Sequence, residues 1–272
     1  MNRKDFFKLT VPATLLMTNG KIARATDRLS SRLPVNEPVL RFVVASDGHY
    51  GLQGTPYKAY FSAFTAEVNR LHAKKPFACC IINGDIIHDD KQYFPGAKKA
   101  LDELTPTYYV SQGNHDHATA DEWKSIWNMP VNHDFSIGAH SFLIGTTSNE
   151  KGTYLCPDMR WLSGVMEKHK NQKNIFIFLH INPGKLTRHG VDCPELFTLL
   201  NKYRNVRAVF NGHDHDEDSI KVREAIPFVF DAHFGGNWGT EYLGFRVVEL
   251  FEDNTISTYI HNPFKIINQA IL

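Results

Sequence analysis

Five short apolar stretches in this sequence are each followed directly by Asp, Asn or His, in most cases beside a glycine. β-Branched and aromatic residues dominate these stretches, which is typical of buried strands. Segments with apolar residues three and four positions apart lie between several of them, at residues 57–74, 157–170 and 194–203. That spacing predicts amphipathic helices, and the alternation of strands with helices predicts an α/β fold.

The predicted strands fall into two groups along the chain. Strands that alternate with helices come first, and strands without intervening helices follow residue 218. The 272 residues contain no repeat, low-complexity tract or interdomain linker, so we expect a single domain over residues 26–272. The predicted strands cover residues 40–46, 77–83, 107–111, 141–145, 174–179, 206–210, 220–223, 228–230, 242–250 and 255–260.

Polar residues at the predicted strand ends form the candidate functional site. Ligands of open α/β sheets bind beyond the carboxyl ends of the strands. His213 and His215 stand two positions apart after such a strand, and alternate side chains of an extended segment point the same way. Both imidazoles can therefore aim at one point, which suggests a metal. The residues that follow the other strands are Asp47, His49, Asp85, Asn114, His115, Asp116 and His180.

The order of these residues resembles the calcineurin-like metallophosphoesterases. The blocks D-x-H, G-D, G-N-H-D, a lone His and G-H-x-H occur in that family's order over roughly residues 40–262. The resemblance implies a four-layer α/β/β/α sandwich of two mixed β-sheets flanked by helices, with a binuclear metal centre. It implies that Asp85 bridges two ions, one held by Asp47, His49, Asp85 and His215, the other by Asp85, Asn114, His180 and His213.

The chemistry of these side chains agrees with what the resemblance implies. One carboxylate has two oxygens and can bind two cations, and imidazole and amide ligands suit divalent or mixed-valence Mn, Fe or Zn. Two such ions can activate a shared water and stabilise charge on a phosphorus oxygen. We therefore expect a phosphohydrolase that cleaves phosphomonoester or phosphodiester bonds by attack of a metal-bridging hydroxide.

Two further residues have expected catalytic roles. The resemblance implies that His115 protonates the leaving oxygen and that Asp116 orients its imidazole, a task that suits the ordinary pKa of histidine. His117 and the stretch 88–90 (HDD) lie close enough in sequence to contribute. The loop 185–189 (KLTRH) after His180, and the stretch 233–239 (HFGGNWG) with Phe234, Asn237 and Trp238, are candidate walls of a substrate pocket.

Several related activities remain as alternatives. Purple acid phosphatases carry a tyrosine ligand after G-D, whereas Ile86 and Ile87 follow Asp85 here. The motifs are also similar to those of cyclic-nucleotide phosphodiesterases, although residues 181–183 (INP) replace the histidine-proline run often found there. A nuclease and a non-catalytic phosphoesterase-like binding scaffold are the remaining alternatives.

The N-terminus has the features of an export signal. A basic start precedes a short apolar run at residues 9–18, and Ala23-Arg24-Ala25 is a small-x-small cleavage pattern. Residues 3–8 (RKDFFK) resemble a twin-arginine signal with Lys4 in place of the second arginine. We expect residues 1–25 to be a signal peptide of the twin-arginine or general secretory pathway and the protein to be periplasmic or secreted. The alternative is an uncleaved arm on a cytoplasmic enzyme.

Charge and cysteine content limit the partners. Removal of residues 1–25 takes away five basic residues and one acid from a net charge of +1, which leaves −3. A chain of that charge has no general attraction for long nucleic acid, so a small phosphorylated substrate is expected. No apolar stretch reaches the roughly 18 residues of a membrane span. Cys156 and Cys193 can pair in an oxidising compartment, and no feature specifies the oligomeric state.

Overall fold

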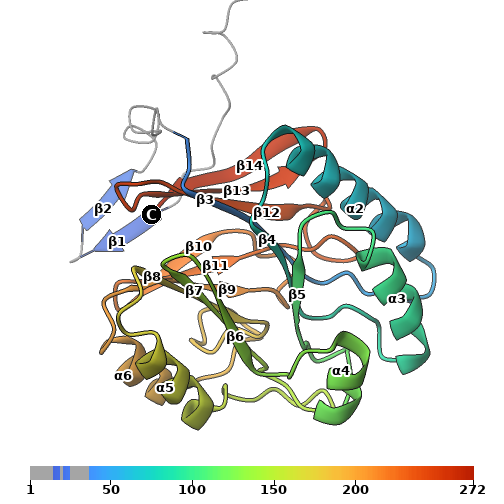
Figure 1. Ribbon diagram of the computed structural model, residues 1–272, viewed down its shortest axis with the longest axis horizontal. Helices are drawn as coiled ribbons and strands as arrows, with labels where there is room; N and C mark the ends of the chain where they lie inside the picture. Colours follow the sequence, from blue (N-terminus) through green and yellow to red (C-terminus); the bar gives the residue numbers. More distant parts are fainter. Residues whose placement is uncertain (1–14, 19–20, 25–36) are drawn as a thin grey trace, which may run out of the picture.

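Two six-stranded sheets pack face to face in the computed structural model, which describes residues 15–18, 21–24 and 37–272 (Figure 1). One sheet has the order β14-β13-β12-β3-β4-β5 and the other β10-β11-β9-β8-β7-β6. The strands of the first are β3 (Leu40–Ala45), β4 (Cys79–Asn83), β5 (Tyr108–Ser111), β12 (Phe245–Leu250), β13 (Ile256–Asn262) and β14 (Lys265–Ile271). Those of the second are β6 (His133–Ile137), β7 (His140–Gly145), β8 (Asn174–Leu179), β9 (Val206–Asn211), β10 (Ile220–Arg223) and β11 (Ile226–Phe230).

Both sheets are mixed. Strands β3, β4 and β5 are parallel. Strand β12 pairs antiparallel with β3, β13 with β12, and β14 with β13. In the other sheet β7, β8, β9 and β11 are parallel, with β6 and β10 antiparallel at its two edges. Parallel strands end at the same edge of a sheet, so the carboxyl ends of the central strands of each sheet lie together.

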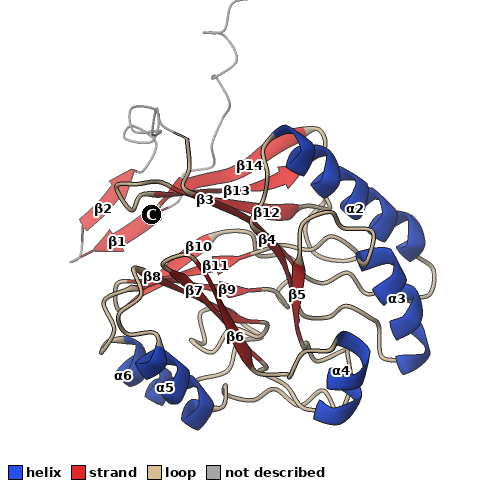
Figure 2. Cartoon of the chain, in the orientation of Figure 1, coloured by secondary structure: helices blue, strands red, loops and turns tan. Residues whose placement is uncertain are grey.

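Helices cover the outer face of each sheet (Figure 2). The first sheet is covered by α2 (Tyr57–Lys74), α3 (Phe94–Leu101) and α4 (Ala120–Trp127), with a 3₁₀ turn at Lys91–Tyr93. The second is covered by α5 (Met159–Lys168) and α6 (Pro194–Leu200). The predicted four-layer α/β/β/α sandwich is therefore confirmed.

Alternation along the central strands explains the layers. In β8 the side chains of Phe176 and Phe178 enter the core between the sheets, where they meet Phe42 and Phe210. The intervening residues of β8 pack against α5 and α6. Every residue of β8 is buried, which is why the strand reads as a continuous apolar run rather than an alternating one.

The predicted signal peptide, residues 1–25, falls largely outside the described residues. Within it, β1 (Leu15–Thr18) and β2 (Lys21–Arg24) pair as an antiparallel hairpin. None of the helices in the described part of the chain combines the length and apolar character that crossing a bilayer requires.

Candidate metal centre

The strand ends bring all seven predicted metal ligands to one edge of the sandwich. Asp47 and His49 follow β3, Asp85 follows β4, and Asn114 follows β5. His180 follows β8 in the other sheet. His213 and His215 follow β9, so the site is built from both sheets.

Asp47, His49 and His215 form a first group of ligand atoms. Their side chains are buried. Nε2 of His215 lies 3.0 Å from Oδ1 of Asp47 and 3.0 Å from Nε2 of His49. Oδ2 of Asp85 lies 3.8 Å from Nε2 of His49. A single ion could therefore contact Asp47, His49 and His215, and Asp85 lies next to His49.

Asp85, His180 and His213 form a second group. Oδ2 of Asp85 lies 3.2 Å from Nε2 of His180, so this carboxylate faces both groups. Oδ1 of Asn114 and Nε2 of His213 are buried and have no hydrogen-bond partner among the residues that the structure describes. A buried polar atom without a partner is costly. Nitrogen and oxygen atoms in this state can donate a lone pair to a cation, as the second predicted ligand set requires.

Neighbouring groups orient the imidazoles of the ligand histidines. Nδ1 of His180 lies 2.7 Å from the carbonyl oxygen of Asn83, and Nδ1 of His215 lies 3.2 Å from that of Trp238. Each carbonyl can accept only from a protonated Nδ1, which leaves Nε2 as the ligand atom. Backbone N–H groups of His115 and His213 donate to Asp85 and Asp47 and fix the two carboxylates.

The backbone at the ligands is strained. Asp47, His49, Asp85 and His213 have φ values of 60°, 46°, 51° and 66°, a left-handed region that non-glycine residues seldom adopt. Gly113 allows its turn to approach a ligand carboxylate closely, because a Cβ there would lie 2.2 Å from Oδ1 of Asp85. The turns are therefore shaped to bring ligand atoms together rather than for local stability.

Burial and charge set the protonation of the ligands. Burial lowers the pKa of His49 to about 3 and, with the nearby His180, that of His213 to about 4, so both imidazoles are neutral near pH 7. Burial opposes charge on His180 as well, but Asp85 and Asp47 raise its pKa to about 10. The two carboxylates thus favour positive charge between them, and bound cations would supply that charge.

His115 lies beside the first group, but its carboxylate partner is not the predicted one. Nδ1 of His115 lies 2.6 Å from Oδ1 of Asp89. Asp116 is buried, and its oxygens accept from the backbone N–H groups of Ile86, Ile87 and Gly113. The prediction that Asp116 orients His115 is wrong, because that carboxylate is used to hold two ligand-bearing turns together. Burial and the charge of Asp85 raise the pKa of Asp116 to about 7.

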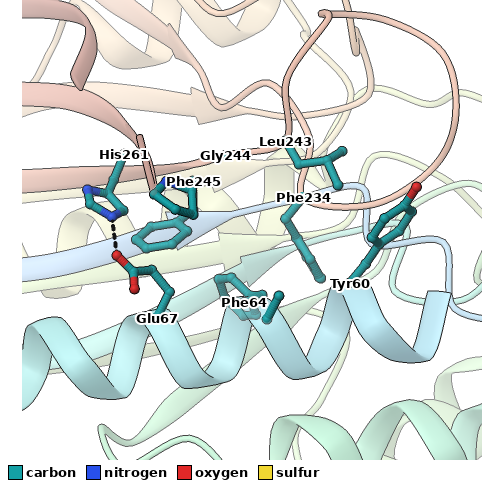
Figure 3. Close-up of a pocket in the computed structure, with 10 residues that line it drawn as sticks. Tyr60, Phe64, Glu67, Phe234, Leu243, Gly244, Phe245 and His261 are labelled. Atoms are coloured by element: carbon teal, nitrogen blue, oxygen red, sulfur yellow. Dashed lines mark hydrogen bonds and ion pairs between the residues drawn. The ribbon is translucent and has the colours of Figure 1, made fainter. Parts of the chain in front are cut away.

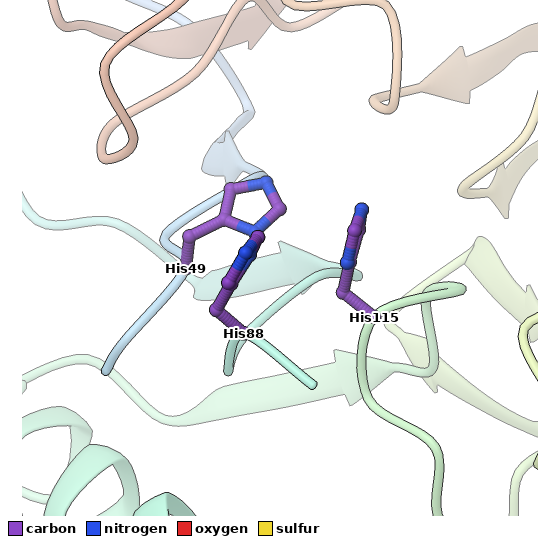
Figure 4. A group of neighbouring side chains, drawn as sticks. All are labelled: His49, His88 and His115. Carbon is purple, nitrogen blue, oxygen red and sulfur yellow. The ribbon is translucent and has the colours of Figure 1, made fainter. Parts of the chain in front are cut away.

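His88 is a site residue that the motifs do not identify. Its ring stacks on His115 with 4.8 Å between centroids, and its Nδ1 lies 3.1 Å from Nδ1 of His49 (Figure 4). His49, His88 and His115 form a third group of close imidazole nitrogens. The signal in the sequence was the run His88-Asp89, which begins three positions after Asp85 of the G-D block. Its contacts with His49 and His115 depend on how the three loops that carry these histidines are arranged, which the sequence alone does not specify.

Two exposed aromatic residues border the site. Tyr154 packs edge-on against the His213 ring, with 4.7 Å between centroids. Trp238 stacks on the His215 ring at 4.4 Å. The loop 185–189 also reaches the site, since Thr187 donates to Asp214 and the His189 ring lies 6.1 Å from that of His213.

Phe234 lines a different pocket from the one expected. It is buried beneath Gly48 and stacks on Phe64 of α2, on the helix side of the turn. There it borders an apolar cavity of about 80 Å³ (Figure 3). The Glu67–His261 pair lies at the same cavity. Trp238 is the expected wall residue whose ring packs against ligand histidines.

Cys156 and Cys193 form a disulfide, with 5.7 Å between their Cα atoms. It joins the loop that carries Tyr154 to the residue before α6. The pairing that the sequence allowed is thus formed, and one wall of the site is covalently attached to a helix.

Comparison with known proteins agrees with this geometry. The sequence profile of the calcineurin-like phosphoesterases matches residues 40–217, which contain all seven candidate ligands. The chain belongs to the calcineurin-like phosphoesterase family. A 3′,5′-cyclic-nucleotide phosphodiesterase of Nostoc sp. is 24% identical to this family member over 225 residues, which cover 73% of this chain and 82% of the relative.

Solved structures share the calcineurin-like phosphoesterase fold with this chain. A dimetal phosphatase from Danio rerio superposes with a TM-score of 0.67 at 13% identity, over 86% of this chain and 99% of that one. A purple acid phosphatase from yellow lupin (Lupinus luteus) superposes with a TM-score of 0.63 at 12% identity, over 88% of this chain and 54% of that one. Identities this low show a common fold only.

Proposed function

We propose that this chain is a phosphohydrolase that uses two divalent or mixed-valence ions of Mn, Fe or Zn. The observation that carries the proposal is that Asp85 faces two separate groups of ligand atoms, each completed by buried imidazoles. Asp47, His49, Asp85 and His215 would hold one ion, and Asp85, Asn114, His180 and His213 the other. When bound, such a pair supplies a hydroxide near neutral pH and stabilises charge on phosphorus oxygens.

Protonation of the leaving oxygen is the step that we assign to His115. Its Nδ1 is held by Asp89 at 2.6 Å, so the opposite ring nitrogen, Nε2, is free to carry a proton to the leaving oxygen. The ring is partly exposed, with a side-chain exposure of 30%, which gives a substrate access to that nitrogen. His115 is therefore the proposed general acid, and Asp89 is its positioning residue.

The proposed substrate is a small phosphate monoester or diester. Hydrolysis of cyclic nucleotides is a second candidate, favoured by the likeness to the Nostoc phosphodiesterase. The departure at residues 181–183 does not oppose it, because Asn182 is buried and its side chain accepts from the N–H of Gly184, which stabilises a turn. A nuclease and a binding scaffold remain alternatives that the same assays separate.

The test begins with metal content. Purified protein should carry about two ions per chain, lose hydrolysis with a chelator, and regain it with Mn²⁺. A panel of phosphomonoesters, phosphodiesters, cyclic nucleotides, pyrophosphates and single-stranded DNA then defines the substrate. Undiminished activity in a metal-free preparation would exclude this mechanism, and bound metal without turnover on any member of the panel would favour the scaffold.

Asp85→Asn is the decisive variant. It removes charge from the side chain that faces both groups, so we expect loss of both ions and of hydrolysis. Asp90→Asn is the matched control, because Asp90 lies in the same loop but is exposed and only caps the 3₁₀ turn. Two retained ions in the Asp85→Asn variant would show that Asp85 is not a shared ligand.

A further inference from the structure

The side chain of Trp238 is an exposed aromatic surface in contact with two candidate metal ligands. Its exposed fraction is 43%. Its ring plane lies within 8° of the His215 ring at 4.4 Å, and its centroid is 4.8 Å from that of His49. An indole that is partly exposed beside two candidate metal ligands is placed to contact a molecule bound at the site.

Trp238 is the outer member of a stack of three rings. The His233 ring, which is buried, lies 4.8 Å from His215 at an angle of 18°. One face of an imidazole has room for a single parallel ring, so His233 and Trp238 cover opposite faces of His215. The indole face that meets His215 is therefore occupied, and the 43% exposure of Trp238 leaves part of its ring surface open to solvent.

The loop that presents Trp238 is fixed by the metal-binding turns. The N–H groups of Phe234 and Gly235 donate to the carbonyl oxygens of Ser46 and Asp47, and the N–H of Thr240 donates to that of His215. Gly235 lies so close to the β3 turn that a Cβ would stand 1.9 Å from the carbonyl oxygen of Gly48. The Trp238 ring and the metal-binding residues are thus held in fixed positions before a substrate binds. This lowers the entropy cost of binding.

From these contacts we infer that Trp238 is a stacking platform for a nucleobase attached to the phosphate that is hydrolysed. The inference rests on the proposed function and names the substrate class as phosphate esters of nucleosides. The phosphate occupies the metal site while the base continues the stack of His233, His215 and Trp238. His115 contacts the same His49 ring as Trp238, with centroids 5.0 Å apart, so the base and the proton donor lie around one ligand.

Binding of hydrolysis-resistant analogues tests the platform without requiring turnover. The ligands are methylene phosphonates of AMP and of ribose 5-phosphate, which differ in the base alone, titrated into Mn²⁺-loaded protein by calorimetry. Stacking of a base on an aromatic side chain should make the AMP analogue bind roughly 5- to 150-fold more tightly. Equal affinity of the wild-type protein for the two analogues would overturn the proposal.

Two substitutions separate stacking from simple shielding of His215. Trp238→Phe keeps an aromatic face and should retain most of the preference for the AMP analogue. Trp238→Leu keeps an apolar cover without that face and should abolish the preference while leaving affinity for the ribose analogue within about twofold. Equal weakening of both analogues by Trp238→Leu would mean that the ring only protects the metal site. Phe264→Leu, at an aromatic residue with 94% exposure in another part of the surface, is the control.

Failure of the platform and failure of the proposed function give different results. Metal-dependent hydrolysis of nitrophenyl phosphates, combined with equal binding of the two analogues, would remove the platform alone. A preference for the AMP analogue that depends on Trp238, without hydrolysis of any ester, would remove the proposed function and leave the platform as a nucleotide-binding site.

Discussion

The ligand residues combine backbone strain with metal chemistry. Asp47, His49 and Asp85 are held in left-handed backbone by hydrogen bonds between the turns, such as those from the N–H of Asp47 to Gly84 and from the N–H of His49 to Asp85. Each such residue costs roughly 1 to 3 kcal/mol and persists only where its surroundings enforce it. A conformation that is costly at three ligands together is best explained by the ions they are proposed to bind.

The pairing of His115 with Asp89 predicts a dependence on the leaving group. Removing a general acid typically slows a reaction by roughly 100- to 10,000-fold, and the loss falls as the leaving group becomes a better anion. Metal-replete His115→Asn should therefore slow an alkyl or ribosyl ester much more than a nitrophenyl ester. Asp89→Asn should show a weaker version of the same bias. Rates on paired esters, with metal content measured for each variant, provide the test.

Asp116→Asn is the informative contrast for that experiment. Its carboxylate accepts from three backbone N–H groups rather than from His115. We expect a loss of stability and of metal without selectivity between leaving groups. Equal slowing of both esters by His115→Asn would instead assign His115 to stabilisation of phosphate charge.

The raised pKa of His180 predicts how metal affinity changes with pH. With a pKa of about 10 in the metal-free protein, His180 is protonated at neutral pH, and an ion that binds Nε2 must displace that proton. Mn²⁺ affinity should therefore rise by about tenfold per pH unit between roughly pH 6.5 and 8.5, since ligation requires the deprotonated imidazole. Calorimetry in buffers of different ionisation enthalpy counts the released proton. Affinity that does not change with pH would contradict the assignment of His180.

At the scale of elements, the parallel strands made the site predictable. A ligand directly after a buried strand has its position set by the strand, as at Asp85 after β4 and His180 after β8. The α2 and β8 boundaries were predicted to the residue, α2 from apolar residues three and four positions apart and β8 from a continuous apolar run. Neither the strand β6 nor the strand β14 was predicted, and both lie at sheet edges with many half-exposed residues that weaken the apolar pattern.

Contacts between loops were beyond the sequence pattern. Asp89 and His115 are 26 positions apart, and His49 and His88 are 39 apart. Which carboxylate pairs with His115 depends on how the turns that carry Asp89 and His115 are placed. The sequence favoured Asp116 only because it is adjacent to His115. The disulfide was left open for the same reason, since a pairing over 37 positions depends on how α5 and β8, which lie between the two cysteines, are arranged.

The disulfide between Cys156 and Cys193 should stabilise both the fold and one wall of the site. A cross-link of this kind typically contributes about 2 to 4 kcal/mol to the free energy of unfolding. Replacement of both cysteines by serine should lower that free energy by this amount, measured by urea unfolding. It should also raise KM more than it lowers kcat, because Tyr154 beside His213 loses its attachment.

Reducing agent provides the matched control for that variant. Reduction should destabilise the wild-type protein to the level of the double serine variant and leave the variant itself unchanged. Cys79 and Cys80 are buried, and burial raises their pKa values, so neither is a ready partner for exchange. Equal stability of reduced and oxidised wild-type protein would contradict a structural role for the disulfide.

At the scale of the whole molecule, the disulfide bears on where the protein works. Such bonds persist in oxidising compartments and are rare in the cytosol. This supports our proposal that residues 1–25 are an export signal, that residues 26–272 form one catalytic domain, and that the mature enzyme is periplasmic or secreted. An extracytoplasmic location also suits small phosphate esters as substrates. The chain has a net charge of −3 after cleavage, so its overall charge does not attract these anions, and only the metal site would.

Export makes a definite prediction about the N-terminus of the mature protein. Ala23-Arg24-Ala25 offers the small residues that a signal peptidase requires, so cells that produce the full chain should release a protein that begins at or near Thr26. N-terminal sequencing of the extracytoplasmic fraction measures this directly. Replacement of Ala23 and Ala25 by leucine should block cleavage and retain the longer form, whereas replacement of Arg24 by lysine should not. Recovery of a chain that begins at Met1 in the cytosol alone would instead identify residues 1–25 as an N-terminal arm of a cytoplasmic enzyme, whose disulfide would then need a local explanation.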